Sequence, residues 1–476
     1  MNRTRAQAWL IRDAEVGGER TDLRIRNGRI HSMGRHLPGE EDELEWHAEG
    51  GHLIPGLHDH HIHLFALGAS LESVRCGPPN VFNAQQLEKA LQQASIESGP
   101  GNWLRGIGYH ESVAGDLDRQ SLDRLGPSCP IRIQHRSGAR WIFNSLALEE
   151  LERKTPRNTP NPLEKDTRGE FTGRLNRADQ WLRERLAPTA PPELARVNQL
   201  LTSFGVTGCC DATPDNGAQS IALFERAQAR GEWNPRLRIM GQRNLPVSQS
   251  DQIERGAWKI LLDENRLPER TELIEQIRSV HHAGRGVAIH CVTRAELVFA
   301  ASAVEEAGSL PLDRIEHASI APPDCIEWLT QLPLSVITQP NFVEERGDQY
   351  LEAVHKNDQP WLYRCQGFLK AGVRLAGGTD APFGNPDPWR AMRAAIDRRT
   401  AGGSLLGREE ALSPEQALAL FMSPLDSPGG APRTIRPGEP ADLCLLDRGW
   451  HGIRDRMDAA DLAAVWIRGR RVDQSD

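Results

Sequence analysis

Two histidines near the start of the chain, His61 and His63, are separated by a single residue at the end of an apolar run. Alternate residues of a β-strand point to the same face, so both imidazoles would project to one side. Imidazole is a common metal ligand. One such pair is a weak signal in 476 residues with 16 histidines, but its place at a strand end predicts a metal site.

Four further polar residues strengthen that prediction: each lies in a short apolar run that is typical of a buried strand, namely Lys259, His290, His317 and Asp380. Lys259 is one of only six lysines and is flanked by Trp258 and Ile260. Burying a cationic amine among apolar neighbours is costly, so a compensating partner is expected. The simpler alternative is that Lys259 extends to the strand end and reaches solvent.

From about residue 200, strand-like runs alternate with helical ones. The predicted strands cover residues 205–211, 236–241, 258–263, 286–292, 314–319, 335–342 and 373–382. With the strand that carries His61 there are eight, which predicts a (β/α)8 barrel. A helix is expected over 268–283, and Thr293 with Glu296 forms a capping box for the next helix. In such a barrel the active site lies at the C-terminal ends of the strands, where all six polar residues fall.

The remaining segments predict two further domains. Residues 1–50 and 435–476 both alternate short strands with turns, and we expect them to pair into one small β-sandwich. The barrel then comprises residues 51–65 and 200–434. Residues 66–199 are an insertion after the first barrel strand, with its own strands over 103–110 and 131–137, and are expected to act as a lid.

Composition limits the function classes. The formal charge of −8 gives no electrostatic reason to expect nucleic acid or an anionic membrane as partner, so a small molecule is the default. No apolar run reaches membrane-spanning length. Eight scattered cysteines without a CxxC pair suit a reducing cytoplasm, the predicted location. Serine-hydrolase elbows, P-loops and dinucleotide fingerprints are absent from the sequence.

The stretches PGLHDHHIHL, WKILLDE, AIHCV, RIEHAS, TQPNF, GGTDAPFG and PADLCLLD follow one another in an order that resembles the amidohydrolase superfamily. Within it the chain is similar to the YtcJ-like, amidohydrolase-3 type metal-dependent hydrolases, over essentially its whole length. The family motif selects His61 and His63 over the competing pair His58 and His60. Since His58 replaces an apolar residue and His60 fills a free position, the roles of these two extra histidines stay open.

The resemblance also implies roles for the other residues. Lys259 would be carboxylated and bridge two divalent metals, His290 and His317 would bind the second metal, and Asp380 would touch the metal and transfer the proton. The alternatives are a lysine paired with Asp263 or Glu264, structural histidines, and an aspartate that caps a turn. The implied cofactor is a divalent metal, with Zn²⁺ expected, at one or two ions per chain.

The implied reaction is hydrolysis of a non-peptide C–N bond in a small molecule, with metal-activated hydroxide as nucleophile and Asp380 as general acid and base. Three alternatives stay open: a mononuclear deaminase, an esterase or lactonase of the same superfamily, and a catalytically silent metal-binding relative. A homodimer is a compatible assembly. The candidate substrate-binding residues come from the insertion and from two barrel strand ends: Tyr109, His135, Arg136, Gln339 and Asn341.

Overall fold

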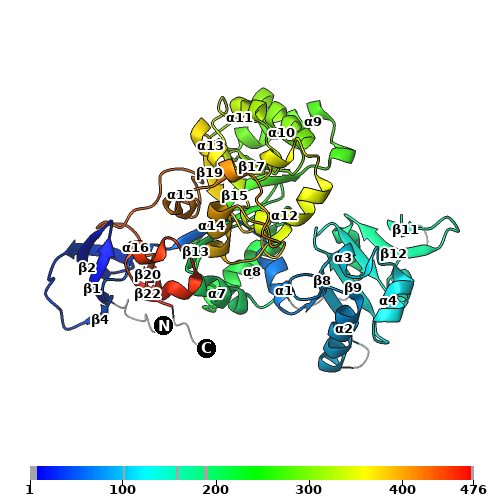
Figure 1. The fold of residues 1–476 in the computed structure, drawn as a ribbon, viewed down its shortest axis with the longest axis horizontal. Coiled ribbons are helices and arrows are strands. Elements are labelled where there is room, and N and C mark those ends of the chain that lie inside the picture. The colour runs from blue at the N-terminus through cyan, green and yellow to red at the C-terminus, as the bar shows by residue number, and fades with distance from the viewer. Residues whose placement is uncertain (1–7, 100–101, 157–159, 187–190, 473–476) are drawn as a thin grey trace. The chain divides into compact units, whose positions relative to one another are not determined.

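The computed structural model describes residues 8–99, 102–156, 160–186 and 191–472. The chain divides into two compact units. One comprises Met1–Leu64 together with Leu194–Asp476, and the other comprises Phe65–Glu193. Figure 1 shows the ribbon coloured along the chain.

The centre of the first unit is one eight-stranded parallel sheet that curves into a nearly closed barrel. Its strands follow one another in chain order: β6 (Leu57–Ile62), β13 (Val206–Asp211), β14 (Arg236–Gly241), β15 (Ile253–Leu261), β16 (Val287–Cys291), β17 (Arg314–His317), β18 (Ser335–Thr338) and β19 (Arg374–Gly377). Their sequences are apolar because both faces of a parallel sheet are buried. The predicted (β/α)8 barrel is thereby confirmed.

Three strand boundaries differ from the prediction by four residues or more. One is the end of β19, which lies at Gly377 where the sequence predicted a strand through residue 382. β15 begins at Ile253, five residues before the predicted start, because Ile253, Glu254 and Arg255 already pair with β14. β18 ends at Thr338, where the sequence predicted a strand through residue 342. Pro340 adopts a helical conformation with φ −60° and ψ −29°, so Asn341 begins a helix rather than ending a strand.

Helices between the strands cover the barrel: α8 (Ala218–Ala229), α9 (Arg270–His282), α10 (Arg294–Ala307), α11 (Pro323–Leu329), α12 (Asn341–Ala353), α13 (Gln366–Ala371), α14 (Pro388–Asp397) and α15 (Pro414–Ala419). The predicted helix over 268–283 is α9, and it buries Leu273, Ile277 and Val280 on one stripe. The capping box of Thr293 and Glu296 forms at the start of α10.

Strands from both ends of the chain build a small β-domain within the first unit. One sheet has the order β3 (Arg29–Gly34), β2 (Glu19–Arg26), β1 (Ala8–Val16), β4 (Glu43–His47), and the other has β22 (Arg470–Arg471), β21 (Leu462–Ile467), β20 (Leu443–Leu446), β5 (Leu53–Pro55). Figure 1 shows the blue and red strands together. The ring of Trp466 packs edge to face against those of Trp9 and Trp46, with ring centroids 6.0 Å apart in each pair. The two sheets therefore share one core.

The second unit is built around a six-stranded mixed sheet. Its order is β11 (Leu163–Lys165), β12 (Phe171–Asn176), β10 (Arg140–Phe143), β9 (Ile131–His135), β8 (Leu104–Tyr109) and β7 (Val74–Arg75). Helices α2 (Ala84–Ser98), α4 (Arg119–Leu125) and α5 (Ser145–Arg153) pack on it. The strands predicted over 103–110 and 131–137 are β8 and β9. The exact domain boundaries and the role of this unit as a lid stay predictions.

The barrel closes between its first and last strands through residues that follow β19. The Asp380 amide donates to the His61 carbonyl at 2.8 Å, and the His63 amide donates to the Ala381 carbonyl at 2.9 Å. Gly378 permits this approach: a Cβ there would lie 2.5 Å from the His61 Cβ and 2.7 Å from its amide nitrogen. The chain thus brings Asp380 against the histidine pair.

We predict that Gly378→Ala destabilises the protein by about 1–3 kcal/mol, because the added methyl group meets main-chain atoms that cannot move aside. Urea unfolding measures the change. Gly34→Ala is the matched control, since its Cβ would lie 3.5 Å from the Leu37 side chain, an ordinary contact. Equal stabilities of the two variants would contradict this account of barrel closure.

Candidate metal centre

Three predicted ligands converge at the C-terminal end of the barrel. The Asp380 Oδ1 atom lies 3.2 Å from His63 Nε2 and 3.5 Å from His61 Nε2. One donor atom from each of the three residues lies within 4.8 Å of the others. Donors bound to one Zn²⁺ at 2.0–2.2 Å with tetrahedral angles are roughly 3.4 Å apart. The separations therefore fit a divalent ion held by these residues.

The imidazole rings are oriented by partners on their other nitrogens. His61 Nδ1 contacts Glu316, His63 Nδ1 lies 3.1 Å from the Thr213 hydroxyl, and His317 Nδ1 donates to Gln339 Oε1 at 2.7 Å. An acceptor on Nδ1 fixes the tautomer that leaves a lone pair on Nε2. Each ring is thus held ready to bind a metal through Nε2.

Two further rings continue the cluster beyond His61. The centroid of His317 lies 4.7 Å from that of His61 and 4.5 Å from that of His290. Burial first, and then the neighbouring His290, lower the pKa of His317 well below its ordinary value. Burial and Lys259 do the same to the pKa of His61. The neutral, metal-binding forms are therefore favoured at neutral pH.

Lys259 lies in the same region with its amine buried. The residue is 3% exposed, and its Nζ atom has no hydrogen-bond partner within the described part of the chain. Burial lowers its pKa, an effect that the nearby Glu316 and Asp380 oppose. A buried amine without a partner is costly to keep charged. The site thus presents a nitrogen that an added group could satisfy.

Glu316 is the main negative charge beneath the candidate ligands. It is fully buried and pairs with Arg314 through its Oε1 atom at 2.7 Å. Burial alone would raise the pKa of Glu316, but Arg314 and Lys259 lower it below its ordinary value. The carboxylate therefore stays ionised, and it contacts His61 Nδ1. A carboxylate on the second nitrogen increases the basicity of a ligating imidazole.

Two of the candidate ligands have left-handed backbone conformations. His317 has φ +69° and Asp380 has φ +56°, a region that residues other than glycine rarely adopt. Such conformations cost on the order of 1–3 kcal/mol each and persist where the surrounding structure holds them in place. Their occurrence at both strand ends supports a functional rather than a purely structural role.

The extra histidines of the motif point elsewhere. His58 Nδ1 donates to the Ser423 carbonyl at 2.9 Å, and His60 Nε2 lies 3.1 Å from the Ser423 hydroxyl. Asp59 accepts from the Thr379 hydroxyl at 2.5 Å, and burial raises its pKa to about 6. The structure therefore places His61 and His63, and not His58 and His60, beside Asp380.

The predicted substrate residues are engaged within the protein. Gln339 holds His317, and Asn341 Nδ2 donates to the Thr379 carbonyl at 3.1 Å. In the second unit, the Tyr109 hydroxyl donates to Gly115 O at 2.6 Å, and His135 Nε2 lies 3.1 Å from Glu111. The Arg136 amide donates to the Tyr109 carbonyl at 2.9 Å. Substrate binding by these five residues stays a prediction.

Sequence reasoning missed two residues beneath the centre, Arg314 and Glu316. Both lie in RIEH, a strand in which all four residues are buried. An arginine and a glutamate two positions apart in a buried strand share one face and must pair there. That spacing was the available signal. Gln339 was predicted only as a substrate contact, although its side chain holds His317. Thr213, two residues after β13, contacts His63 Nδ1.

Comparison with known proteins agrees with this arrangement. A model of the amidohydrolase family, Amidohydro_3, matches residues 46–473. The chain belongs to the amidohydrolase family. A metal-dependent hydrolase of uncharacterised function from Pyrococcus horikoshii OT3 has the same fold, with a TM-score of 0.74 at 21% identity over 98% of this chain and 100% of that one.

Two relatives of this amidohydrolase are similar over most of their length. N-substituted formamide deformylase from Arthrobacter pascens is 25% identical over 84% of each chain. The putative amidohydrolase YtcJ from Bacillus subtilis is 24% identical over 85% of this chain and 86% of its own. Among the described residues of this family member, no helix combines the length and the apolarity needed to cross a membrane.

We predict that Gln339→Leu weakens metal binding about 10–100-fold, because His317 loses the acceptor that fixes its tautomer. Titration against a competing chelator measures the affinity. Gln331→Leu makes the same change at an exposed position just after α11 and should bind metal as the wild type does. Unchanged affinity in Gln339→Leu would show that Gln339 does not support the centre.

Proposed function

We propose that this protein is a metal-dependent hydrolase that cleaves a non-peptide C–N bond of a small molecule. The observation that carries the proposal is the convergence of His61, His63 and Asp380 at the C-terminal end of the barrel. That end of the fold is where catalytic residues of (β/α)8 enzymes lie. Membership of the amidohydrolase family supports the same reaction class.

We assign the metal-binding roles to His61, His63, His290, His317, Lys259 and Asp380. The donor set of imidazoles and carboxylate suits Zn²⁺, and one or two divalent ions per chain fit it. Lys259 supports a second ion if carbon dioxide adds to its buried amine, because the resulting carbamate is a bridging anion. Bound metal would lower the pKa of water from about 15.7 toward about 7.

Asp380 is the residue proposed to transfer the proton. Its Oδ1 atom lies among the Nε2 atoms of both histidines of the pair, beside the position where a metal would be held. From there the carboxylate accepts a proton from the attacking water and returns it to the leaving nitrogen. Its backbone is held by the hydrogen bond to the His61 carbonyl, so the carboxylate is oriented before substrate binds.

The substrate class we propose is an N-substituted formamide or a related small amide. The relative from Arthrobacter pascens is named for deformylation of N-substituted formamides and is similar over 84% of both chains. A formyl group is small and places a C–N bond within reach of the carboxylate without demanding a large cleft. Tyr109, His135, Arg136, Gln339 and Asn341 remain the proposed substrate contacts.

We predict that Asp380→Asn lowers kcat for a hydrolysed formamide by about 10²–10⁴-fold, since asparagine cannot accept the proton. Initial rates are measured at saturating metal, so that any loss of affinity is compensated. Asp397→Asn changes an exposed aspartate at the end of α14 and should leave kcat unchanged. Full activity of Asp380→Asn would exclude Asp380 as the proton carrier.

We predict that the wild type, purified with zinc and bicarbonate, holds about two metal ions per chain, and that Lys259→Ala holds about one or fewer. Elemental analysis measures the content. Lys370→Ala removes an exposed lysine of α13 and should keep the wild-type content. One ion in both wild type and Lys259→Ala would exclude the bridging role and favour a mononuclear deaminase.

A further inference from the structure

A second chemically distinctive region lies at the opposite, N-terminal end of the barrel. A cavity of about 70 Å³ is lined there by Arg238, Arg255, Gly256, Ala257, Gly284, Arg285, Gly286, Pro311, Leu312, Arg314, Leu425, Asp426 and Pro428. Several of these residues directly precede β16 and β17 in the chain, so the cavity opens away from the candidate metal centre. Its volume holds on the order of five water molecules.

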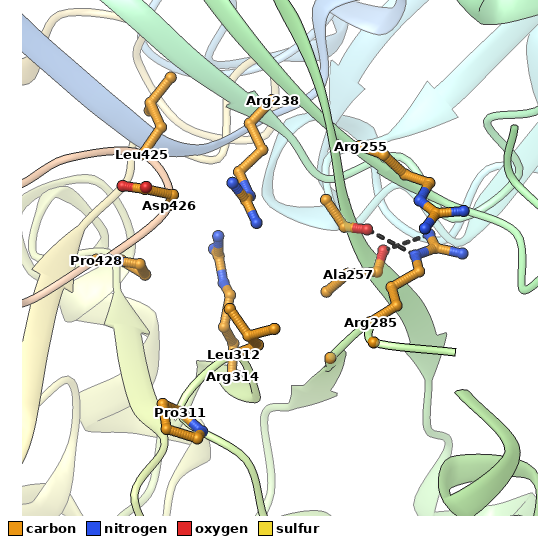
Figure 2. Close-up of a pocket in the computed structure, with 13 residues that line it drawn as sticks. Arg238, Arg255, Ala257, Arg285, Pro311, Leu312, Arg314, Leu425, Asp426 and Pro428 are labelled. Carbon is orange, nitrogen blue, oxygen red and sulfur yellow. Dashed lines mark hydrogen bonds between the residues drawn. The ribbon is translucent and has the colours of Figure 1, made fainter. Parts of the chain in front are cut away.

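Arginine dominates the charge around this cavity, with four guanidinium groups and one carboxylate, that of Asp426, among the lining residues. Figure 2 shows the side chains of Arg238 and Arg314 pointing toward one another across the cavity. Both act to lower the pKa of the Cys210 thiol, which burial raises. The two positively charged guanidinium groups repel each other, and an anion between them would offset that repulsion.

The anionic partners of these two arginines lie outside the cavity lining. Arg314 pairs with Glu316, one layer nearer the metal centre, and Arg238 pairs with Glu254 at 2.7 Å. The Glu254 side chain is 49% exposed, so solvent screens the ion pair between Glu254 and Arg238 and weakens it. Arg238 is therefore able to turn toward an anion in the cavity.

The second pair of arginines, Arg255 and Arg285, adds positive charge that forms no ion pair within the described part of the chain. Arg285 makes its hydrogen bonds, within the described residues, only to main-chain carbonyls, including those of Gly256 and Ala257 (Figure 2). Burial and the neighbouring Arg255 lower its pKa to about 10. Arg255 itself is exposed and takes part in no ion pair among the described residues. A negative ligand would stabilise both cations.

We propose that this cavity binds a small oxyanion of about the size of phosphate, held by Arg238 and Arg314 from opposite sides and by the charge of Arg255 and Arg285. Guanidinium groups bind such oxygens through paired, charge-assisted hydrogen bonds. Leu425 and Pro428, in the loop after α15, form an apolar wall that limits the ligand to a small ion. The inference of this site does not rest on the proposed hydrolytic activity.

Calorimetric titration of the purified full-length protein with inorganic phosphate at constant ionic strength tests the proposal. We expect saturable binding to the wild type that Arg238→Gln weakens by about tenfold or more, as loss of a charge-assisted hydrogen bond implies. Arg230→Gln is the matched control, because Arg230 is 68% exposed, pairs with Glu232 and does not line the cavity. It should bind phosphate as the wild type does.

Arg255→Gln is a second variant for the case in which Arg238→Gln does not fold, as judged by circular dichroism. It removes an exposed arginine and should also weaken phosphate binding while leaving stability unchanged. No saturable binding to the wild type at millimolar phosphate would overturn the proposal. Equal binding in wild type and in the folded cavity variants would overturn it as well, since the phosphate would then occupy the metal centre.

Discussion

Closure of the barrel between its first and last strands is the constraint on which the rest of the centre depends. Strands β6 and β19 lie at the two ends of the hydrogen-bonded order, and residues beyond β19 complete the circle. The Asp380 amide donates a hydrogen bond to the His61 carbonyl. The Asp59 carboxylate accepts hydrogen bonds from the Thr379 hydroxyl and amide. Two segments more than 300 residues apart in the chain are thereby joined. Without that junction, the carboxylate and the imidazole pair would not share one position.

A second constraint is the balance of buried charge below the ligands. Arg314, Glu316 and Lys259 are all buried, and isolated charges there would each cost several kcal/mol. Arg314 donates to both oxygens of Glu316, and Glu316 Oε2 also contacts His61 Nδ1. Lys259 contributes a further positive charge whose pKa burial lowers. A core of this kind adds little stability compared with apolar packing, so its presence argues for chemistry.

Local patterns predicted most of the fold. Short apolar runs predicted all eight barrel strands, and the capping box of Thr293 with Glu296 predicted the start of α10, because these signals depend on neighbouring residues alone. The HxH spacing and the polar residue at each strand end predicted the residues that converge. The helical turn at Pro340 was missed, because the strand that begins with the apolar Val336 and Ile337 was extended through TQPNF.

The partners of the ligands could not be predicted in the same way. Glu316 lies 255 positions from His61, and Thr213 lies 150 positions from His63. Such pairings depend on the register and closure of the barrel, which no local spacing encodes. The interpretation of Gln339 as a substrate contact was reasonable for a polar residue at a strand end, and only the geometry shows that its side chain holds His317. Polar residues in a buried strand need a partner, but the sequence does not say which.

Arg314 contacts both the cavity at the N-terminal end of the barrel and the charged residues beneath the metal centre. Its position two residues before Glu316 on β17 places the guanidinium one layer below the carboxylate, because alternate side chains of a strand share a face. One side of this guanidinium borders the cavity of Figure 2, and the other pairs with the carboxylate that orients His61. A column of charged and polar groups therefore runs through the barrel, from the Arg314 guanidinium to the Glu316 carboxylate to the neutral His61 imidazole. In the low dielectric of the interior, each member polarises the next, so the charge at one end contributes to the basicity of the ligand at the other.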